Sequence, residues 1–98
     1  MALKTTKWDL ADYILTPEDV IEHVRLAFED GDPAFIARIL GDVARSKGAT
    51  EIARRSGVSR ETIYKSLTKD GDPRLSTLVG VLRALGLDLS VKVHQEAA

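Results

Sequence analysis

The sequence predicts a mainly α-helical domain of five helices followed by one C-terminal β-strand. Apolar residues recur at helical spacing from residue 20 to residue 85, and helix-start and helix-stop residues divide that stretch into five segments. At residues 87–93 the spacing changes to every second position, as in a strand with one buried face. With 98 residues, 44% of them hydrophobic, the chain has enough apolar surface for one modest core. We therefore expect an N-terminal arm at 1–15, a helical domain at 16–86, and a strand and tail at 87–98.

Two helices with clear boundaries begin the helical domain. Thr16 is an N-cap residue, Pro17 suits the first helical position, and Gly31 ends the helix near residue 30. Asp32-Pro33 repeats the start signal, and Gly48 ends the second helix. The predicted core-facing residues are Val20, Ile21, Val24, Ala27 and Phe28 in the first helix and Ile36, Ile39, Leu40, Val43 and Ala44 in the second.

Residues 49–68 have the spacing of a helix-turn-helix, in which two short helices cross over a sharp turn. Ala53 is small enough for the second helix to lie close to the first, Gly57 suits the left-handed conformation that ends the first, and Ser59 suits the cap of the second. A fifth helix is predicted over residues 75–85, after a turn. The residues expected to point inward from the motif are Ile52, Val58, Ile63 and Leu67.

Long polar side chains are expected to face outward from the second helix of this motif, which predicts binding to duplex DNA. A helix of this kind suits the major groove, where base edges present hydrogen-bond donors and acceptors. Arg60 and Lys65 are the best candidates for base contacts, with Glu61 and Tyr64 beside them. Ser59 is first a helix cap, and Thr62 is either a contact or a half-buried helix residue. The predicted backbone contacts are Thr50, Arg54 and Lys69, together with Arg45, Lys47, Arg55 and Arg74, and for each the alternative is an ordinary solvated side chain.

The distribution of charge supports this prediction although the net charge does not. The formal net charge is only -1, whereas phosphate contacts usually need a basic surface. Residues 1–44 carry a net charge of -5 and residues 45–69 a net charge of +5. The basic excess coincides with the helix-turn-helix, and the acidic excess precedes it.

The predicted strand needs a neighbour, because a lone strand is not stable. One recognition helix reads few base pairs, so useful specificity calls for two copies on a two-fold site with half-sites about 34 Å apart. A homodimer follows as a hypothesis, and the alternative of equal weight is a hairpin with the arm around residues 8–15. The predicted dimer interface is the apolar face of the strand, formed by Leu87, Leu89, Val91 and Val93.

Several functional classes lack the residues that they require. The chain has no cysteine, and its two histidines, His23 and His94, have no metal-spaced partner. We therefore expect no enzyme, no metal and no cofactor. The chain also shows no signal peptide and no apolar run of membrane-spanning length, so a cytoplasmic protein is expected.

Residues 34–86 resemble the lambda Cro and repressor superfamily of helix-turn-helix domains, on the core positions and turn described above. The resemblance implies a lambda-repressor-like five-helix fold and a transcriptional repressor. Two positions depart from the family pattern. Ser56 stands where the family usually has an apolar residue, which predicts looser packing there, and Ser66 replaces a small apolar residue.

A narrower resemblance, to the addiction-module antidote family, covers nearly the whole chain. The matching motifs are Trp8-Asp9, the helix opening at 16–19, residues 29–33, 41–45, 57–61, Gly71-Asp72-Pro73-Arg74 and residues 82–87. The resemblance implies a DNA-binding antitoxin of a type II toxin-antitoxin system that neutralises a small RelE/ParE-type toxin and represses the shared promoter. A stand-alone prophage-type repressor without a toxin, and a protein-interaction module that has lost DNA binding, are the alternatives.

Toxins of this type are typically basic, so the resemblance also implies that the acidic N-terminal part forms the toxin-binding surface. Acids and aromatics at its start are the candidates: Trp8, Asp9, Asp12 and Tyr13, with Glu18, Asp19 and Glu22 beyond them. For Trp8 the alternative is packing on its own domain.

Overall fold

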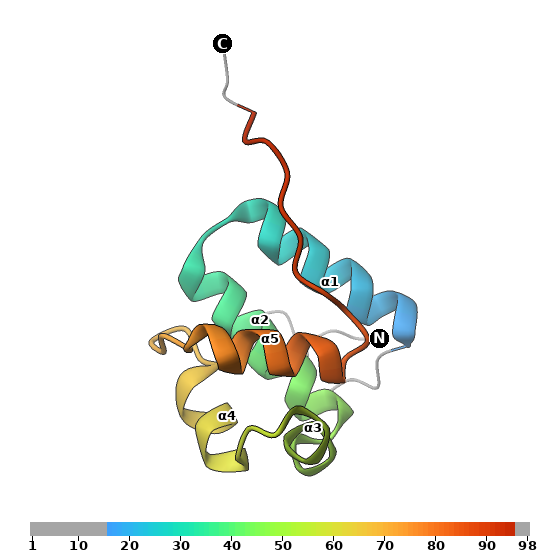
Figure 1. Ribbon diagram of the computed structural model, residues 1–98, viewed down its shortest axis with the longest axis vertical. Helices are drawn as coiled ribbons and strands as arrows, with labels where there is room; N and C mark the ends of the chain where they lie inside the picture. The colour runs from blue at the N-terminus through green and yellow to red at the C-terminus, as the bar shows by residue number, and fades with distance from the viewer. Residues whose placement is uncertain (1–15, 96–98) are drawn as a thin grey trace, which may run out of the picture.

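Five helices make up the ordered framework of the computed structural model, which describes residues 16–95. In Figure 1, α5 crosses the middle of the molecule, with α1 on one side and α3 and α4 on the other. α3 packs against α5, α2 and α4, while α1 packs against α2. The bounds are α1 Pro17–Asp30, α2 Pro33–Lys47, α3 Ala49–Ser56, α4 Arg60–Ser66 and α5 Leu75–Ala84. The prediction of a mainly helical domain with five helices is confirmed.

Local signals set the helix ends where the sequence predicts them. Thr16 and Asp19 form a capping box, in which the Asp19 N–H donates to Thr16 Oγ1 and the Thr16 N–H donates to Asp19 Oδ2, both at 3.1 Å. Gly31 ends α1 in the left-handed conformation with a φ of 84°. Asp32 precedes α2 but forms no side-chain cap bond, so Pro33 at the first helical position is the effective start signal.

All five helices contribute side chains to one apolar core. Ile63 of α4 and Leu67 directly after it have no exposed surface, and Ile52 of α3 is also buried. Val58, in the turn between α3 and α4, is half-buried against the core. These are the residues expected to point inward from the motif. The largest fully buried side chains are Leu40, Val43, Ile63, Leu67 and Val81.

Two glycines allow helices to approach each other more closely than side chains would permit. A Cβ on Gly41 of α2 would overlap the backbone carbonyl oxygen of Leu67, which ends α4. A Cβ on Gly80 of α5 would lie 3.0 Å from the carbonyl oxygen of Ser56, which ends α3. The backbone at the C-terminal end of α4 therefore packs directly against α2, and that of α3 packs directly against α5. These contacts fix the positions of α3 and α4.

The predicted C-terminal strand is wrong for the described part of the chain. Residues 87–95 lie in an extended tail that is not part of any sheet among residues 16–95 (Figure 1). The Leu87 N–H donates to the Leu82 carbonyl oxygen at 2.8 Å, and Leu87 packs against the core, but Leu89, Val91 and Val93 are exposed. Alternation shows which side chains share a side, whereas a strand also needs a neighbour to complete its hydrogen bonds. The arm predicted at 1–15 lies outside the described residues.

Candidate nucleic-acid interface

The turn between α3 and α4 is held by hydrogen bonds from both sides. Gly57 ends α3 with a φ of 77°, and its N–H donates to the Ala53 carbonyl oxygen at 3.0 Å. Ser59 caps α4 by accepting the Thr62 N–H at 3.0 Å, and its hydroxyl donates to Thr62 Oγ1 at 2.9 Å. Because both flanking helices are capped, the turn holds α4 in one orientation relative to α3.

Ser56 takes part in this turn in a way that the sequence does not reveal. Its hydroxyl accepts the Val58 N–H at 3.0 Å, which pairs a backbone group inside the turn. Looser packing was expected there because an apolar residue is missing, but Ser56 offsets the lost contact with a hydrogen bond. The pairing depends on the backbone reversing direction at Gly57, so it becomes visible only in the folded chain.

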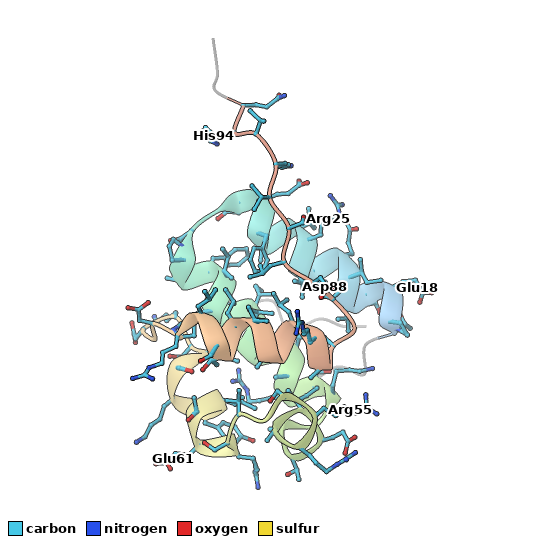
Figure 2. All side chains as sticks on the ribbon, in the orientation of Figure 1. Glu18, Arg25, Arg55, Glu61, Asp88 and His94 are labelled. Atoms are coloured by element: carbon cyan, nitrogen blue, oxygen red, sulfur yellow. The ribbon has the colours of Figure 1, made fainter. Side chains whose placement is uncertain are left out.

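α4 presents a row of exposed polar side chains on its outer side. Arg60 lies over the ring of Tyr64, with its guanidinium carbon 5.6 Å from the ring centroid. One position along, Lys65 Nζ pairs with Glu61 Oε2 at 3.1 Å, and both of these side chains are about three-quarters exposed. Glu61 is labelled in Figure 2 at the far end of the molecule from the tail. All four residues predicted to face outward from α4 therefore do so.

α3 carries a second group of exposed charges beside α4. Glu51 Oε2 accepts from Arg54 at 2.5 Å and from Arg55 at 2.8 Å. The hydrogen bonds from Arg54 and Arg55 hold the pKa of the Glu51 carboxyl below its usual range, and the bond to Glu51 raises the pKa of Arg54. These are solvent-exposed pairs, so they orient the guanidinium groups but contribute little to stability.

The structure also reveals a polar groove between α4 and the first turn of α5. Its volume is about 520 Å³, and Lys65 and Arg74 contribute its two cations. Thr77 lies in its wall with only 6% of its surface exposed. The first turn of α5 contains no acidic residue. The groove is lined by Gly57, Val58, Ser59, Thr62, Lys65, Ser66, Asp72, Arg74, Ser76 and Thr77.

The remaining predicted backbone contacts occupy different settings. Thr50 and Lys69 are exposed, Thr50 in the first turn of α3 and Lys69 after α4. Arg45 is instead tied to the buried carboxylate of Asp42, which Arg38 also approaches at 3.8 Å. The Arg45 side chain is thus engaged in an ion pair within α2. Thr50, Arg54 and Lys69 remain exposed at the surface beside α4.

Sequence comparison assigns the family. The family model described as "Probable addiction module antidote protein" matches residues 4–93 of the 98 in the chain. The chain belongs to this antidote family. An uncharacterized protein of Haemophilus influenzae is 32% identical over 85 residues, which cover 87% of this chain and 88% of that protein. No solved structure matches the chain.

Membership of the antidote family implies a toxin partner of some kind and a regulatory rather than an enzymatic role. The four residues predicted to bind a toxin, Trp8, Asp9, Asp12 and Tyr13, lie outside the described residues. Within residues 16–95, no cluster of histidine and acidic side chains has the geometry of a metal site. None of the helices described is long and apolar enough to cross a membrane.

Sequence reasoning missed two residues of this antidote's polar groove, Ser76 and Thr77. They lie in the first turn of α5, shortly after Arg74. Small hydroxyl residues are common at the start of a helix, so these two residue types alone do not indicate a binding site. Only the placement of α5 beside α4 brings their hydroxyls near Lys65. The sequence signal that could have pointed to them is Arg74, two residues before Ser76, which is already predicted as a backbone contact; the carboxylate of Asp72 also lines the groove.

Proposed function

We propose that this antidote is a DNA-binding antitoxin that represses its own promoter and neutralises a RelE/ParE-type toxin. The observation that carries the proposal is the pair α3 and α4, joined by the turn at 57–59, with the exposed polar row on α4. This arrangement supports the proposal of a helix-turn-helix of the lambda Cro and repressor type. Family membership supplies the antidote role independently of that geometry.

In the proposed complex, α4 enters the major groove and Arg60 makes the principal base contact. An arginine binds guanine O6 and N7 with two hydrogen bonds, which discriminates against a wrong base by about 1–3 kcal/mol. The Tyr64 ring under the guanidinium restricts its motion and so lowers the entropic cost of that contact. Glu61 accepts from a cytosine amino group or orients Lys65, with which it is already paired.

Backbone phosphates lie on either side of α4 in this proposal. Thr50 lies in the first turn of α3, whose N-cap Gly48 provides no side-chain cap, so the N–H groups of that turn would receive a phosphate. Arg54 and Lys69 add charge next to it. On the other side, the polar groove seats a phosphate between Arg74 and the hydroxyls of α5. These contacts position α4, while the side chains of α4 select the sequence.

A homodimer on a two-fold operator completes the DNA-binding proposal. α4 has seven residues and spans about 10 Å at 1.5 Å per residue, so one copy reads only part of one groove. Two copies bring two such helices to half-sites about 34 Å apart. Leu87, Leu89, Val91 and Val93, three of which are exposed in the single chain, are the proposed interface.

The proposed toxin contact uses the acidic N-terminal part of the chain. Trp8, Asp9, Asp12 and Tyr13 begin it, and the exposed carboxylates of Glu18, Asp19 and Glu22 on α1 continue it. A basic toxin meets complementary charge on this surface, which speeds association and excludes acidic partners. The part of it on α1 is separate from α4, which lies on the other side of α5 (Figure 1).

The test combines co-expression with promoter binding. The tagged chain is expressed together with the small basic protein encoded next to its own gene. Size-exclusion chromatography then shows whether the two proteins elute as one complex. The purified chain is then titrated with its promoter and with a scrambled duplex, as are Arg60→Ala and the control Arg83→Ala, which changes an exposed arginine at the far end of α5 from the polar groove.

One stable complex with the toxin, together with promoter preference that Arg60→Ala removes and Arg83→Ala keeps, is the expected result. Promoter preference without any toxin complex favours a stand-alone repressor. A toxin complex without affinity for any duplex favours a protein-interaction module and ends the DNA-binding proposal.

A further inference from the structure

We propose that the dimer forms by exchange of tails, with residues 87–93 of a second copy lying in a groove between α1 and the tail of the first. This inference rests on the proposed function only for its use on a two-fold operator. We call this space the tail groove. Its volume is about 630 Å³, and it is lined by Ile21, Arg25, Phe28 and Glu29 of α1, Leu82 of α5, and residues 87–92 of the tail.

The floor of the tail groove is continuous with the apolar core. Leu82 is 2% exposed and belongs to the core, and Phe28 and Leu87 pack against it. Ile21 on the α1 wall is 49% exposed although it lies one residue after the buried Val20. Residues 16–95 thus leave an apolar surface open where α1 and the tail diverge, and an apolar occupant would cover it.

The tail has the residues that such an occupant needs. Along its alternating apolar positions, Leu87 is half-buried, whereas Leu89 is 41%, Val91 97% and Val93 85% exposed. Beyond Leu87, the tail backbone makes no hydrogen bond to any other part of residues 16–95. Figure 1 shows the tail crossing α1 and leaving the helical body. Among residues 16–95, neither the two valines nor the tail backbone beyond Leu87 has a partner.

Symmetry identifies the partner as a second copy. The tail forms one wall of the groove, and the same tail carries the exposed valines. With a two-fold axis through the groove, the valines of each copy would cover the open apolar surface of the other. Two antiparallel tails then lie between two α1 helices, with Val91 of one copy against Ile21 and Phe28 of the other. The surface is self-complementary, which an unrelated partner would not require.

Charge also suits this occupant. α1 carries five carboxylates and one arginine, and that arginine, Arg25, is already paired with Glu22 at 2.9 Å and Glu29 at 3.2 Å. The charged α1 residues that line the groove, Arg25 and Glu29, balance each other, and Glu22, which pairs with Arg25, adds one further carboxylate beside them. The tail brings Lys92, an exposed cation between the two valines, and its own Asp88 is paired with Arg83 at 3.5 Å. An exchanged tail places Lys92 beside the carboxylates of the opposite α1.

Cysteine cross-linking tests the exchange directly, because the natural chain contains no cysteine. Chains carrying Ile21→Cys and chains carrying Val91→Cys are mixed, allowed to exchange and oxidised. We expect a disulfide-linked heterodimer on non-reducing gels. The control pairs Val91→Cys with Glu18→Cys, which lies on the same helix outside the tail groove and should give no such band.

The double variant Ile21→Cys/Val91→Cys separates exchange between chains from packing within one chain. Linked dimers support the proposal, whereas a monomer with an internal disulfide overturns it and assigns the groove to the chain's own tail. Val91→Asp with Val93→Asp should raise the dimer dissociation constant by about 100-fold or more at unchanged helicity, since each buried valine contributes at least about tenfold. A dimer of unchanged affinity would also overturn it.

These results are independent of the proposed function. Sedimentation and cross-linking are measured without DNA or toxin. A tail-exchanged dimer that binds no duplex leaves this inference intact and removes the DNA-binding proposal. Promoter binding by a chain whose tails do not cross-link removes this inference, together with the tail as the proposed dimer interface, and leaves the DNA-binding proposal intact.

Discussion

Gly41→Ala should force α2 and α4 apart and destabilise the fold by about 2 kcal/mol. Gly41 is buried in α2, and an added Cβ would overlap the carbonyl oxygen of Leu67. The distance between these two atoms would be far below 3.0 Å, the shortest approach that Cβ atoms make to such neighbours in proteins. That oxygen belongs to the backbone of a residue without exposed surface, so it cannot rotate away. The C-terminal end of α4 has to move, and the outer row of α4 moves with it.

The magnitude combines two opposing effects. Overpacking a dense core costs about 1–3 kcal/mol, and a rigid backbone obstacle places this site near 3. Alanine is favoured over glycine inside a helix by about 1 kcal/mol, which offsets part of that cost. The net loss of about 2 kcal/mol corresponds to a fall in Tm of roughly 8–16 °C for a domain of this size.

Thermal and urea denaturation followed by circular dichroism measures this loss. Gly80→Ala is the matched control, since its Cβ would lie 3.0 Å from the Ser56 carbonyl oxygen and a shift of a few tenths of an ångström relieves the contact. The gain in helix propensity then roughly cancels the strain. If Gly41→Ala unfolds at the same temperature as the natural chain, the close contact between α2 and α4 is not what positions α4.

Three further predictions concern α3 and α4. Ser59→Ala removes the acceptor of the Thr62 N–H and should cost about 1 kcal/mol, or about 4–8 °C in Tm. In promoter titrations, Arg60→Ala should relax sequence preference, whereas Arg54→Ala should weaken all duplexes alike and lower the slope of log affinity against log salt by about 1; equal effects on all duplexes from both would contradict the groove assignment. The folded-state pKa of Glu51 is depressed, so its pairing contributes above the unfolded-state value near 4.5 and is lost as pH falls through the lower folded value. An NMR titration of Glu51 with a midpoint at or above 4.5 would refute that pairing.

The helices of this protein follow from short-range signals, and sequence reasoning located them for that reason. The capping box at Thr16, the prolines that begin α1 and α2 and the glycines that end α1 and α3 act within one helical turn. The outward row on α4 follows from the same periodicity, because burying Ile63 and Leu67 leaves the opposite side of a short helix exposed. Composition and order of residues therefore determined the five helices, the polar character of α4 and most of the core faces, although Ile21 of α1, predicted to face the core, is 49% exposed.

Tertiary structure decided the features in which two distant segments meet. The hydroxyls of Ser76 and Thr77 lie near Lys65 only because α5 packs beside the turn before α4. Gly41 matters because α2 touches the end of α4, 26 residues later in the chain. The tail at 87–93 is a case in which the tertiary partner is missing. Its alternating apolar residues predicted a strand, but no other segment of residues 16–95 forms a sheet with it. Periodicity specifies which way a side chain points, but pairing and close approach depend on what stands opposite, which is a property of the folded chain.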